Sequence, residues 1–134
     1  MRSYLLRIVT PEKVFFEGQT EQIVVRTSDG DLGVLAGHEN YVSDLPPGPF
    51  KVKIDGKYKV AAISGGVLKV SKEATTILAM AAEWAEDIDL DWAKRSREDA
   101  EKRLRETKSD LEHRIAELKL KRAINRQRVG TRDE

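Results

Sequence analysis

The stretch from Ile88 to Arg128 reads IDLDWAKRSREDAEKRLRETKSDLEHRIAELKLKRAINRQR and decides how the chain is organised. It contains neither Gly nor Pro and consists mainly of Ala, Leu, Glu, Lys and Arg, which are strong helix formers. The residues before it form short β-type runs separated by Gly and Pro. The sequence therefore predicts a β body followed by a helical arm.

Two capping signals divide the arm into two helices. Asp89 is the expected N-cap of the first helix. Ser109 and Glu112 form a capping box that starts the second. The two signals predict an antiparallel helical hairpin. Because no residue between the two helices forbids a helix, we expect that the hairpin can also straighten. The expected elements are a helix over about 89–106, a turn over about 107–109 and a helix over about 110–128.

The apolar stripe of the arm is thin and rich in Ala. Small side chains let two helices approach closely, but they bury little apolar surface. We therefore expect close but weak packing between the helices. The residues that mark this face are Ala93, Ala100, Leu104 and Leu111, and the capping box comes just before Ile115, Leu118 and Ala123.

Charge is unevenly spread along the arm. Acids outnumber bases between Asp87 and Glu112, whereas residues 114–128 contain one acid, Glu117, and six bases. A folded hairpin lets the basic helix lie against the acidic one, and an opened hairpin presents a cationic face to an acidic partner. A solvated surface helix is the alternative interpretation. The six bases are Arg114, Lys119, Lys121, Arg122, Arg126 and Arg128.

The preceding residues, 1–87, show the pattern of an antiparallel sandwich or barrel, with about eight or nine short strands. Because Pro cannot sit in a central strand, we expect a break over residues 46–49. Ser64-Gly65-Gly66 indicates another break. The expected strands are 4–9, 13–17, 21–27, 32–35, 41–45, the hairpin 50–63, 67–70 and 75–82.

The hairpin over residues 50–63 has Asp55-Gly56 at its tip. A two-residue loop would place Ile54 opposite Lys57 and mix the apolar and polar faces. We favour a three-residue loop with Gly56 left-handed in a bulge, because it keeps the lysines on the solvent face. The pairs in this register are Val52 with Tyr58 and Phe50 with Val60.

Composition excludes several classes of protein. The chain has 134 residues and a formal net charge of +1, which gives no bulk attraction to nucleic acid or membrane. It contains no Cys and two His, so we expect neither a disulfide framework nor a metal site. No segment has the length and hydrophobicity of a membrane span or a signal peptide. We expect a cytosolic chain, or one held at a membrane complex by its partners.

No catalytic constellation is visible. His38 and His113 lie in different parts of the chain, and no nucleophile stands at motif spacing from either, so we expect no enzyme activity. Gly30 and Gly33 do not form a phosphate loop, because no Lys-Ser/Thr follows. The competing interpretation is an adaptor, a β-sandwich whose basic helix binds RNA or another helical partner. That helix lacks interleaved aromatic residues.

Five segments, taken in order, resemble a known family. They are VTPEKVFFEG (9–18), VVRTSDGDLGVLAGHENYVSDLPPG (24–48), DGK (55–57), AISGGVLKV (62–70) and AEDIDLDWAK (85–94). The most specific piece is Gly30–Leu35 followed by His38, and the next is Ser64–Gly66. Together they resemble the epsilon subunit of bacterial F-type ATP synthase over essentially the whole chain.

The resemblance implies an all-β antiparallel sandwich of about ten strands over residues 1–87 and a two-helix hairpin over 88–134. It implies a non-catalytic subunit of the central stalk at the cytoplasmic face of the plasma membrane. The sandwich would contact the gamma subunit and the c-ring, and the membrane only through that complex. The hairpin would open along gamma toward the alpha and beta subunits and restrain ATP hydrolysis. Its acidic target on beta would meet the six bases named above.

The resemblance also assigns contact residues. The c-ring contacts would be Asp29, Gly30, Asp31, Leu32, Gly33, Val34 and His38. Some relatives bind ATP in the closed hairpin, and the matching positions are Glu83, Ile88, Asp89, Ala93, Arg122 and Arg126. Here Trp92 stands at a motif Arg and Asp99 at another, and each lost charge-assisted bond to phosphate costs about 1.5–3 kcal/mol. We therefore expect regulatory ATP binding to be weakened or absent, and no required cofactor.

Overall fold

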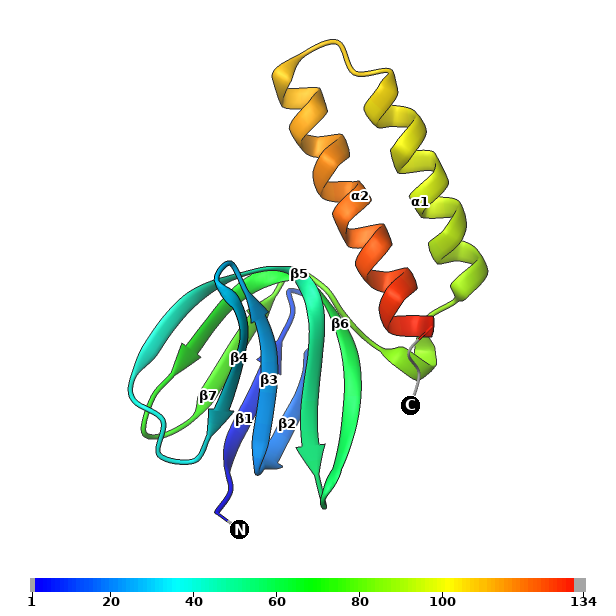
Figure 1. Ribbon diagram of the computed structural model, residues 1–134. Coiled ribbons are helices and arrows are strands. Elements are labelled where there is room, and N and C mark those ends of the chain that lie inside the picture. Colours follow the sequence, from blue (N-terminus) through cyan, green and yellow to red (C-terminus); the bar gives the residue numbers. More distant parts are fainter. Residues whose placement is uncertain (1, 132–134) are drawn as a thin grey trace.

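Eight strands form the sandwich in the computed structural model, which describes residues 2–131. They are β1 (Tyr4–Val9), β2 (Val14–Thr20), β3 (Gln22–Thr27), β4 (Gly30–Leu35), β5 (Tyr41–Ile54), β6 (Lys57–Val70), β7 (Thr75–Ala79) and β8 (Ala82–Trp84). They follow one hydrogen-bonded path, β2-β1-β7-β6-β5-β3-β4, with β8 paired to β6. This path folds into two layers, and the helical hairpin stands at one end (Figure 1).

The strands β5 and β6 are long enough to belong to both layers. They pair antiparallel from Tyr41 opposite Val70 to Ile54 opposite Lys57. One end of β6 continues the path to β7, while at the other end β5 pairs with β3 and β6 with β8. Counted as two halves each, β5 and β6 raise the eight strands to the ten that the resemblance implies.

The predicted breaks at residues 46–49 and 64–66 are wrong, because both segments lie inside the long strands. β3 pairs with β5 only over residues 50–52, so along the prolines β5 has β6 as its neighbour on one side. A strand with one neighbour tolerates residues that lack an N–H. Gly66 permits a close approach between strands, since a Cβ there would lie 2.1 Å from the Leu78 carbonyl oxygen.

The predicted register of the β5–β6 hairpin is also wrong. The loop has two residues, Asp55 with φ 51° and Gly56 with φ 78°, and Ile54 pairs with Lys57. Two left-handed residues match the strand twist better than a bulge does. This register pairs Val52 with Lys59 and so mixes apolar and polar side chains on one face. Little stability is lost, because Lys59 extends its ammonium to the edge of the sandwich. Its Nζ lies 4.2 Å from the Trp84 ring centroid and 3.3 Å from Glu86 Oε1.

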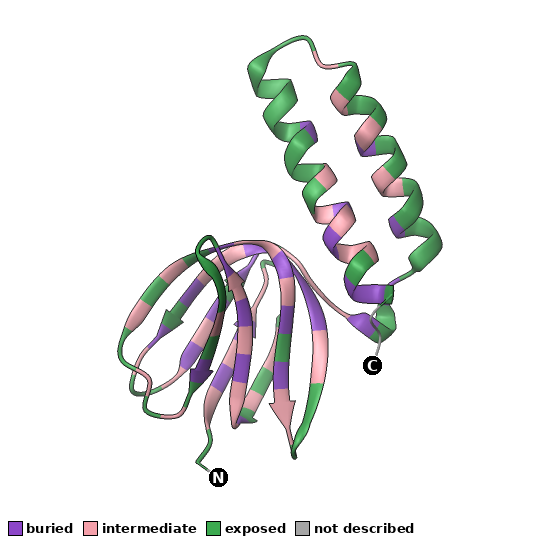
Figure 2. Cartoon of the chain, in the orientation of Figure 1, coloured by how far each residue is buried: buried purple, intermediate pink, exposed green. Residues whose placement is uncertain are grey.

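The core lies between the two layers. Most strand pairs are antiparallel, as predicted, but β1 and β7 run parallel, with Leu6 opposite Thr75. More buried and less buried residues alternate along most of the strands (Figure 2), whereas β6 is buried without a break over residues 61–65. The largest fully buried side chains of the sandwich are Phe50, Leu6, Ile8, Ile23, Leu68 and Ile77.

The hairpin contains α1 (Leu90–Arg105) and α2 (Asp110–Thr131) and follows a short 3₁₀ turn, η1 (Ala85–Asp87). Asp89 caps α1 as predicted, by accepting a bond from Trp92 N over 3.0 Å. At the start of α2, Glu112 N donates to Ser109 Oγ and Lys108 N donates to Glu112 Oε2. Neither helix, nor any other within residues 2–131, is long and apolar enough to cross a bilayer.

The fully buried residues between the two helices are mainly alanines, while several larger apolar residues of α2 are exposed. Leu111 is 64% exposed, so its predicted place on the face shared with Ala93, Ala100 and Leu104 is wrong, and Ile115 and Leu118 are 49% and 39% exposed. Within residues 2–131 no ion pair joins α1 to α2. Within its observed bounds α1 holds four acids and six bases, so it is not the acidic helix that the count over residues 87–112 predicts, and the expected pairing with a basic helix is wrong. The buried alanines are Ala93, Ala100, Ala116 and Ala123.

Candidate functional site at the junction of sandwich and hairpin

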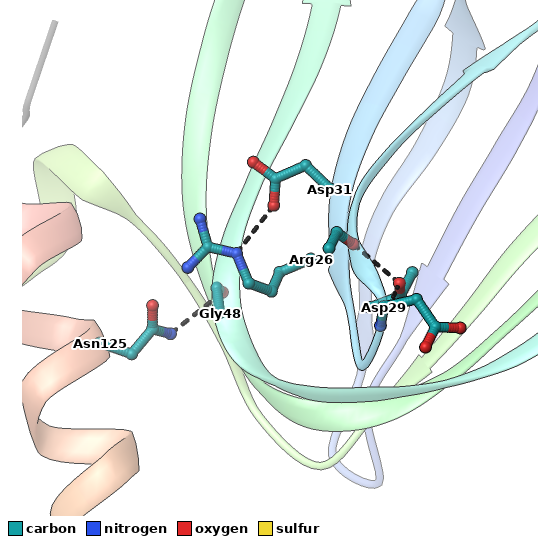
Figure 3. A network of polar contacts seen from close by, with 7 residues as sticks. Arg26, Asp29, Asp31, Gly48 and Asn125 are labelled. Carbon is teal, nitrogen blue, oxygen red and sulfur yellow. Dashed lines mark hydrogen bonds and ion pairs between the residues drawn. The ribbon is translucent and has the colours of Figure 1, made fainter.

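The C-terminal half of α2 docks on the end of the sandwich through one buried amide. Asn125 is 8% exposed, and its Nδ2 donates to the carbonyl oxygens of Gly48, over 3.0 Å, and Ile63, over 3.2 Å. Gly48 belongs to β5 and Ile63 to β6, and Figure 3 shows the bond to Gly48. Because buried polar groups need such partners, Asn125 fixes where α2 sits on the sandwich.

Asn125 was not among the predicted site residues, although the sequence contains a signal for it. A row of residues at alternating spacings of four and three runs along α2, and Asn125 stands within it. A polar residue in such a row is typical of a position that fixes register. The row is Leu111, Ile115, Leu118, Arg122, Asn125 and Val129.

A small apolar cluster, separate from the sandwich core, supports the docking. At Gly130 a Cβ would lie 2.7 Å from Leu90 Cδ2 and 3.0 Å from Ile88 Cγ2, so the last turn of α2 approaches the start of α1 closely. The contact is close but buries few large side chains, which keeps its contribution modest. The cluster comprises Ala62, Ala85, Ile88, Ala93 and Val129, with Val60 packed against it.

Arg126 joins three elements at this junction. Its Nε donates to the carboxylate of Glu83 in β8, and its guanidinium carbon lies 4.7 Å from the ring centroid of Trp92 in α1. The Arg126 side chain is 17% exposed, so both contacts are partly shielded from water. One turn earlier, Arg122 Nε donates to Ser64 O over 3.0 Å. Both arginines therefore hold α2 to the sandwich.

The structure brings most of the predicted ATP-contact residues to this junction. Glu83 and Arg126 bind each other, and Trp92 covers one face of the arginine. Asp89 uses its carboxylate to cap α1. Ile88 and Ala93 belong to the buried apolar cluster, and Arg122 binds the sandwich backbone. The groups that would face a nucleotide already have partners within the chain.

The structure divides the predicted inhibitory basic face. Arg122 and Arg126 turn toward the sandwich, as described above. The other four bases lie exposed on α2, and among them Lys121 is 4.0 Å from Glu117. Arg114, Lys121 and Arg128 follow one another at spacings of seven and share a face of α2, whereas Lys119 lies on another side, beside Arg103 and Glu106. These four are Arg114, Lys119, Lys121 and Arg128.

The predicted c-ring contacts fall into two separate places. Asp29 lies in the turn between β3 and β4, where Thr27 Oγ1 accepts from its N–H and donates to Gly30 O. His38 lies beyond the other end of β4, and its Nδ1 is 2.8 Å from Glu39 O. The six residues of β4 separate the two ends by about 17 Å. The turn stands at the hairpin end of the sandwich and the His38 loop at the opposite end (Figure 1).

The architecture and the junction define a class of protein, a β-sandwich subunit that carries a docked helical hairpin. A family model described as "ATP synthase, Delta/Epsilon chain, beta-sandwich domain" matches residues 3–85. A second, described as "ATP synthase, Delta/Epsilon chain, long alpha-helix domain", matches residues 86–130. Together the matches span nearly all of the chain. The chain belongs to the ATP synthase delta/epsilon chain family.

Within this family the chain is similar to proteins named ATP synthase epsilon chain. It is 44% identical over 133 residues to that of Ruminococcus albus, with 98% of this chain and 99% of the relative covered. It is 43% identical over 126 residues to that of Bacillus velezensis, with 94% of this chain and 96% of the relative covered. The resemblance seen in the sequence is thereby confirmed over the full length.

Two solved structures share the fold. A chain of the Euglena gracilis mitochondrial ATP synthase, in a structure of OSCP, F1 and c-ring, superposes with a TM-score of 0.79 at 26% identity. That match covers 92% of this chain and 78% of the other. A chain of the Tetrahymena thermophila mitochondrial ATP synthase central stalk and c-ring gives a TM-score of 0.72 at 15% identity and covers 96% and 97%. At that identity the second match shows the fold alone.

Proposed function

We propose that this chain is the epsilon subunit of the central stalk of a bacterial F-type ATP synthase, where it is a non-catalytic coupling and regulatory part. The observation that carries the proposal is the full-length match of both sandwich and hairpin to bacterial epsilon chains. The sandwich would join the gamma subunit to the c-ring, and the hairpin would restrain ATP hydrolysis. Membrane association, at the cytoplasmic face, would come only through the complex.

The two ends of β4 support two contact surfaces on the rotor rather than one. The turn at Asp29 and the loop at His38 cannot touch the same small loop of a partner, because about 17 Å of strand separates them. We assign Asp29–Val34 to the c-ring. His38 would face the c-ring only if that partner also spans the end of the sandwich, and gamma is its alternative neighbour.

The hairpin carries a surface suited to a helical partner. Leu111, Ile115 and Leu118 stand at spacings of four and three and remain exposed. They continue, toward the tip of the hairpin, the same row of α2 that docks on the sandwich through Asn125 and Val129. Undocking would expose the whole row, which then fits along another helix. This supports a two-position hairpin, docked in the uninhibited state and extended in the inhibited state.

ATP is not required to hold the docked hairpin in this proposal. Arg126 Nε already donates to the Glu83 carboxylate, and the Trp92 ring already covers one face of the Arg126 guanidinium. A nucleotide would have to displace both contacts without the motif Arg that Trp92 replaces. Calorimetric titration of the isolated chain with ATP tests this point. Binding at micromolar concentration would contradict it.

Reconstitution of the catalytic head tests the main proposal. The full-length chain and a chain ending at Asp87 are added separately to alpha, beta and gamma subunits. Both should copurify with gamma, because the sandwich holds its own core apart from the small cluster at the hairpin. The shortened chain should raise ATP hydrolysis. Failure of either chain to bind gamma would overturn the assignment.

A further inference from the structure

Two side chains close the turn between α1 and α2. Thr107 Oγ1 donates to Leu104 O, in the last turn of α1, over 3.1 Å. The same oxygen lies 3.4 Å from Nδ1 of His113, in the first turn of α2. On its other side, His113 Nε2 lies 3.7 Å from Glu117 Oε2, one turn further along α2. His113 therefore lies between a hydroxyl of the turn and a carboxylate of α2.

The two contacts of the imidazole place different demands on its protons. The one hydroxyl proton of Thr107 is directed to Leu104 O, so Thr107 Oγ1 is left to accept from His113. The carboxylate of Glu117 also accepts, so it too needs a proton on the nitrogen that faces it. A neutral imidazole has one ring proton and serves one of these acceptors, whereas the imidazolium has two and serves both. The protonated form of His113 therefore fits this site better than either neutral tautomer.

The charges on the same face of α2 favour the imidazolium as well. Asp110 stands one turn before His113, and Glu117 stands one turn after it, where Lys121 shares its carboxylate at 4.0 Å. The His113 side chain is 51% exposed, so water screens these charges and the ring bonds carry most of the preference. The other charged residues around the turn are also exposed, and they are Arg103, Arg105, Glu106, Lys108, Glu112 and Arg114.

The contact between Thr107 and His113 requires a bent hairpin. In one continuous helix, residues six apart lie on different faces, because six residues make about 1.7 turns. His113 and Glu117 are four apart on α2, so their contact would persist in such a helix. Straightening of the arm therefore breaks the bond to Thr107 and leaves the imidazole with Glu117 alone.

We propose that His113 is a proton-sensitive clasp, which holds the turn bent when the imidazole is protonated. Histidine changes its charge between about pH 5 and 8. Because the bent hairpin alone offers both acceptors, a fall in pH favours the bent form and a rise in pH favours straightening. The turn lies at the end of the hairpin remote from the sandwich (Figure 1), so the clasp acts on bending and not on docking. This device goes beyond the proposed function and does not depend on it.

A double-mutant cycle in the full chain tests the proposal. Urea unfolding of the unsubstituted chain, Thr107→Val, His113→Ala and the double variant is followed by circular dichroism at about pH 5.5 and at about pH 8, at one ionic strength. The bonds that only one of the two residues makes, to Leu104 O and to Glu117, cancel in the cycle. The unfolded chain lacks the Thr107–His113 contact just as a straight helix does, so the cycle isolates the contribution that opposes straightening.

We expect the two residues to couple by about two- to fivefold in the unfolding equilibrium constant at the lower pH, and by less than about 1.5-fold at the higher pH. A second cycle, of Thr107→Val with His38→Ala, is the control, because His38 titrates in the same pH range but lies in the sandwich. That cycle should show no coupling at either pH. Equal Thr107–His113 coupling at the two pH values, stronger coupling at the higher pH, or no coupling at either would overturn the proposal.

Discussion

Replacing Asn125 by Ala should loosen the hairpin from the sandwich. The substitution removes two hydrogen bonds, from Nδ2 to Gly48 O and to Ile63 O. A hydrogen bond contributes about 0.5–1.5 kcal/mol, so the docked state should lose about 1–3 kcal/mol. That loss corresponds to a roughly 5- to 150-fold shift toward the undocked hairpin. The secondary structure should remain, because the two hydrogen bonds of this side chain go to the sandwich and not to α2.

Fluorescence energy transfer can measure this shift. The chain has no Cys, so one dye can be attached to a new Cys at Lys57 on the sandwich and another at Lys108 on the hairpin turn. Both positions are remote from the junction. Asn125→Ala should lower the transfer efficiency, and in the assembled complex it should deepen the inhibition of ATP hydrolysis.

Gln127→Ala is the matched control on the same helix. Gln127 accepts a bond from Arg97 in α1 and makes no polar contact with the sandwich given by the structure. It should leave the transfer efficiency near that of the unsubstituted chain. Equal efficiencies for Asn125→Ala and the unsubstituted chain would refute the assignment of Asn125 as the docking residue.

Three other predictions concern separate features. Joint replacement of Leu111, Ile115 and Leu118 by Ser should relieve inhibition while changing the free energy of unfolding by less than about 1.5 kcal/mol, because all three are exposed; retained inhibition in the ATPase assay would argue against this surface. Gly66→Ala should destabilise the fold by more than about 2 kcal/mol in urea, since its Cβ would lie 2.1 Å from a backbone oxygen, and an unchanged midpoint would contradict this. Burial raises the pKa of Tyr4. Its contribution to stability is therefore complete below about pH 10 and is lost as pH rises toward the higher folded pKa. Tyr4→Phe should remove that part of the alkaline loss, which sets in above about pH 10, and identical pH profiles would exclude it.

The helical arm could be predicted because its signals are local. Strong helix formers, the Asp89 cap and the capping box at Ser109 and Glu112 all act within a few residues. The sandwich followed from short apolar runs separated by turns. The family resemblance supplied the rest of the outline, because its motifs are spread over the whole chain.

The errors concern features that depend on distant neighbours. Proline was expected to end a strand, but β5 continues through residues 46–49. β3 pairs with β5 only over residues 50–52, so the prolines need no N–H for a bond to β3. The three-residue loop at Asp55-Gly56 was predicted because it keeps apolar and polar side chains on separate faces. The two-residue loop mixes them, but Lys59 extends its ammonium to the edge beside Trp84. Spacing along α2 could not show which part of the row lies on the sandwich and which part lies beyond it.

The site was harder to predict than the fold for the same reason. The bases Arg122 and Arg126 were recognised, but their partners Ser64 and Glu83 are remote in sequence. No local pattern shows that a backbone carbonyl or a lone carboxylate will lie opposite an arginine. The separation of Asp29 from His38 likewise follows from β4 being a straight strand between them.

In the proposed function, the hairpin must leave the sandwich to restrain ATP hydrolysis. Glu83→Cys together with Arg126→Cys places two thiols at the junction of a chain that has no other Cys. A short thiol-to-thiol cross-linker then locks α2 on the sandwich, and the same double variant without cross-linker is the control. In the reconstituted head, the locked chain should permit ATP hydrolysis at the rate of the chain ending at Asp87, whereas the unlocked variant should inhibit. Equal inhibition by locked and unlocked chains would contradict the account.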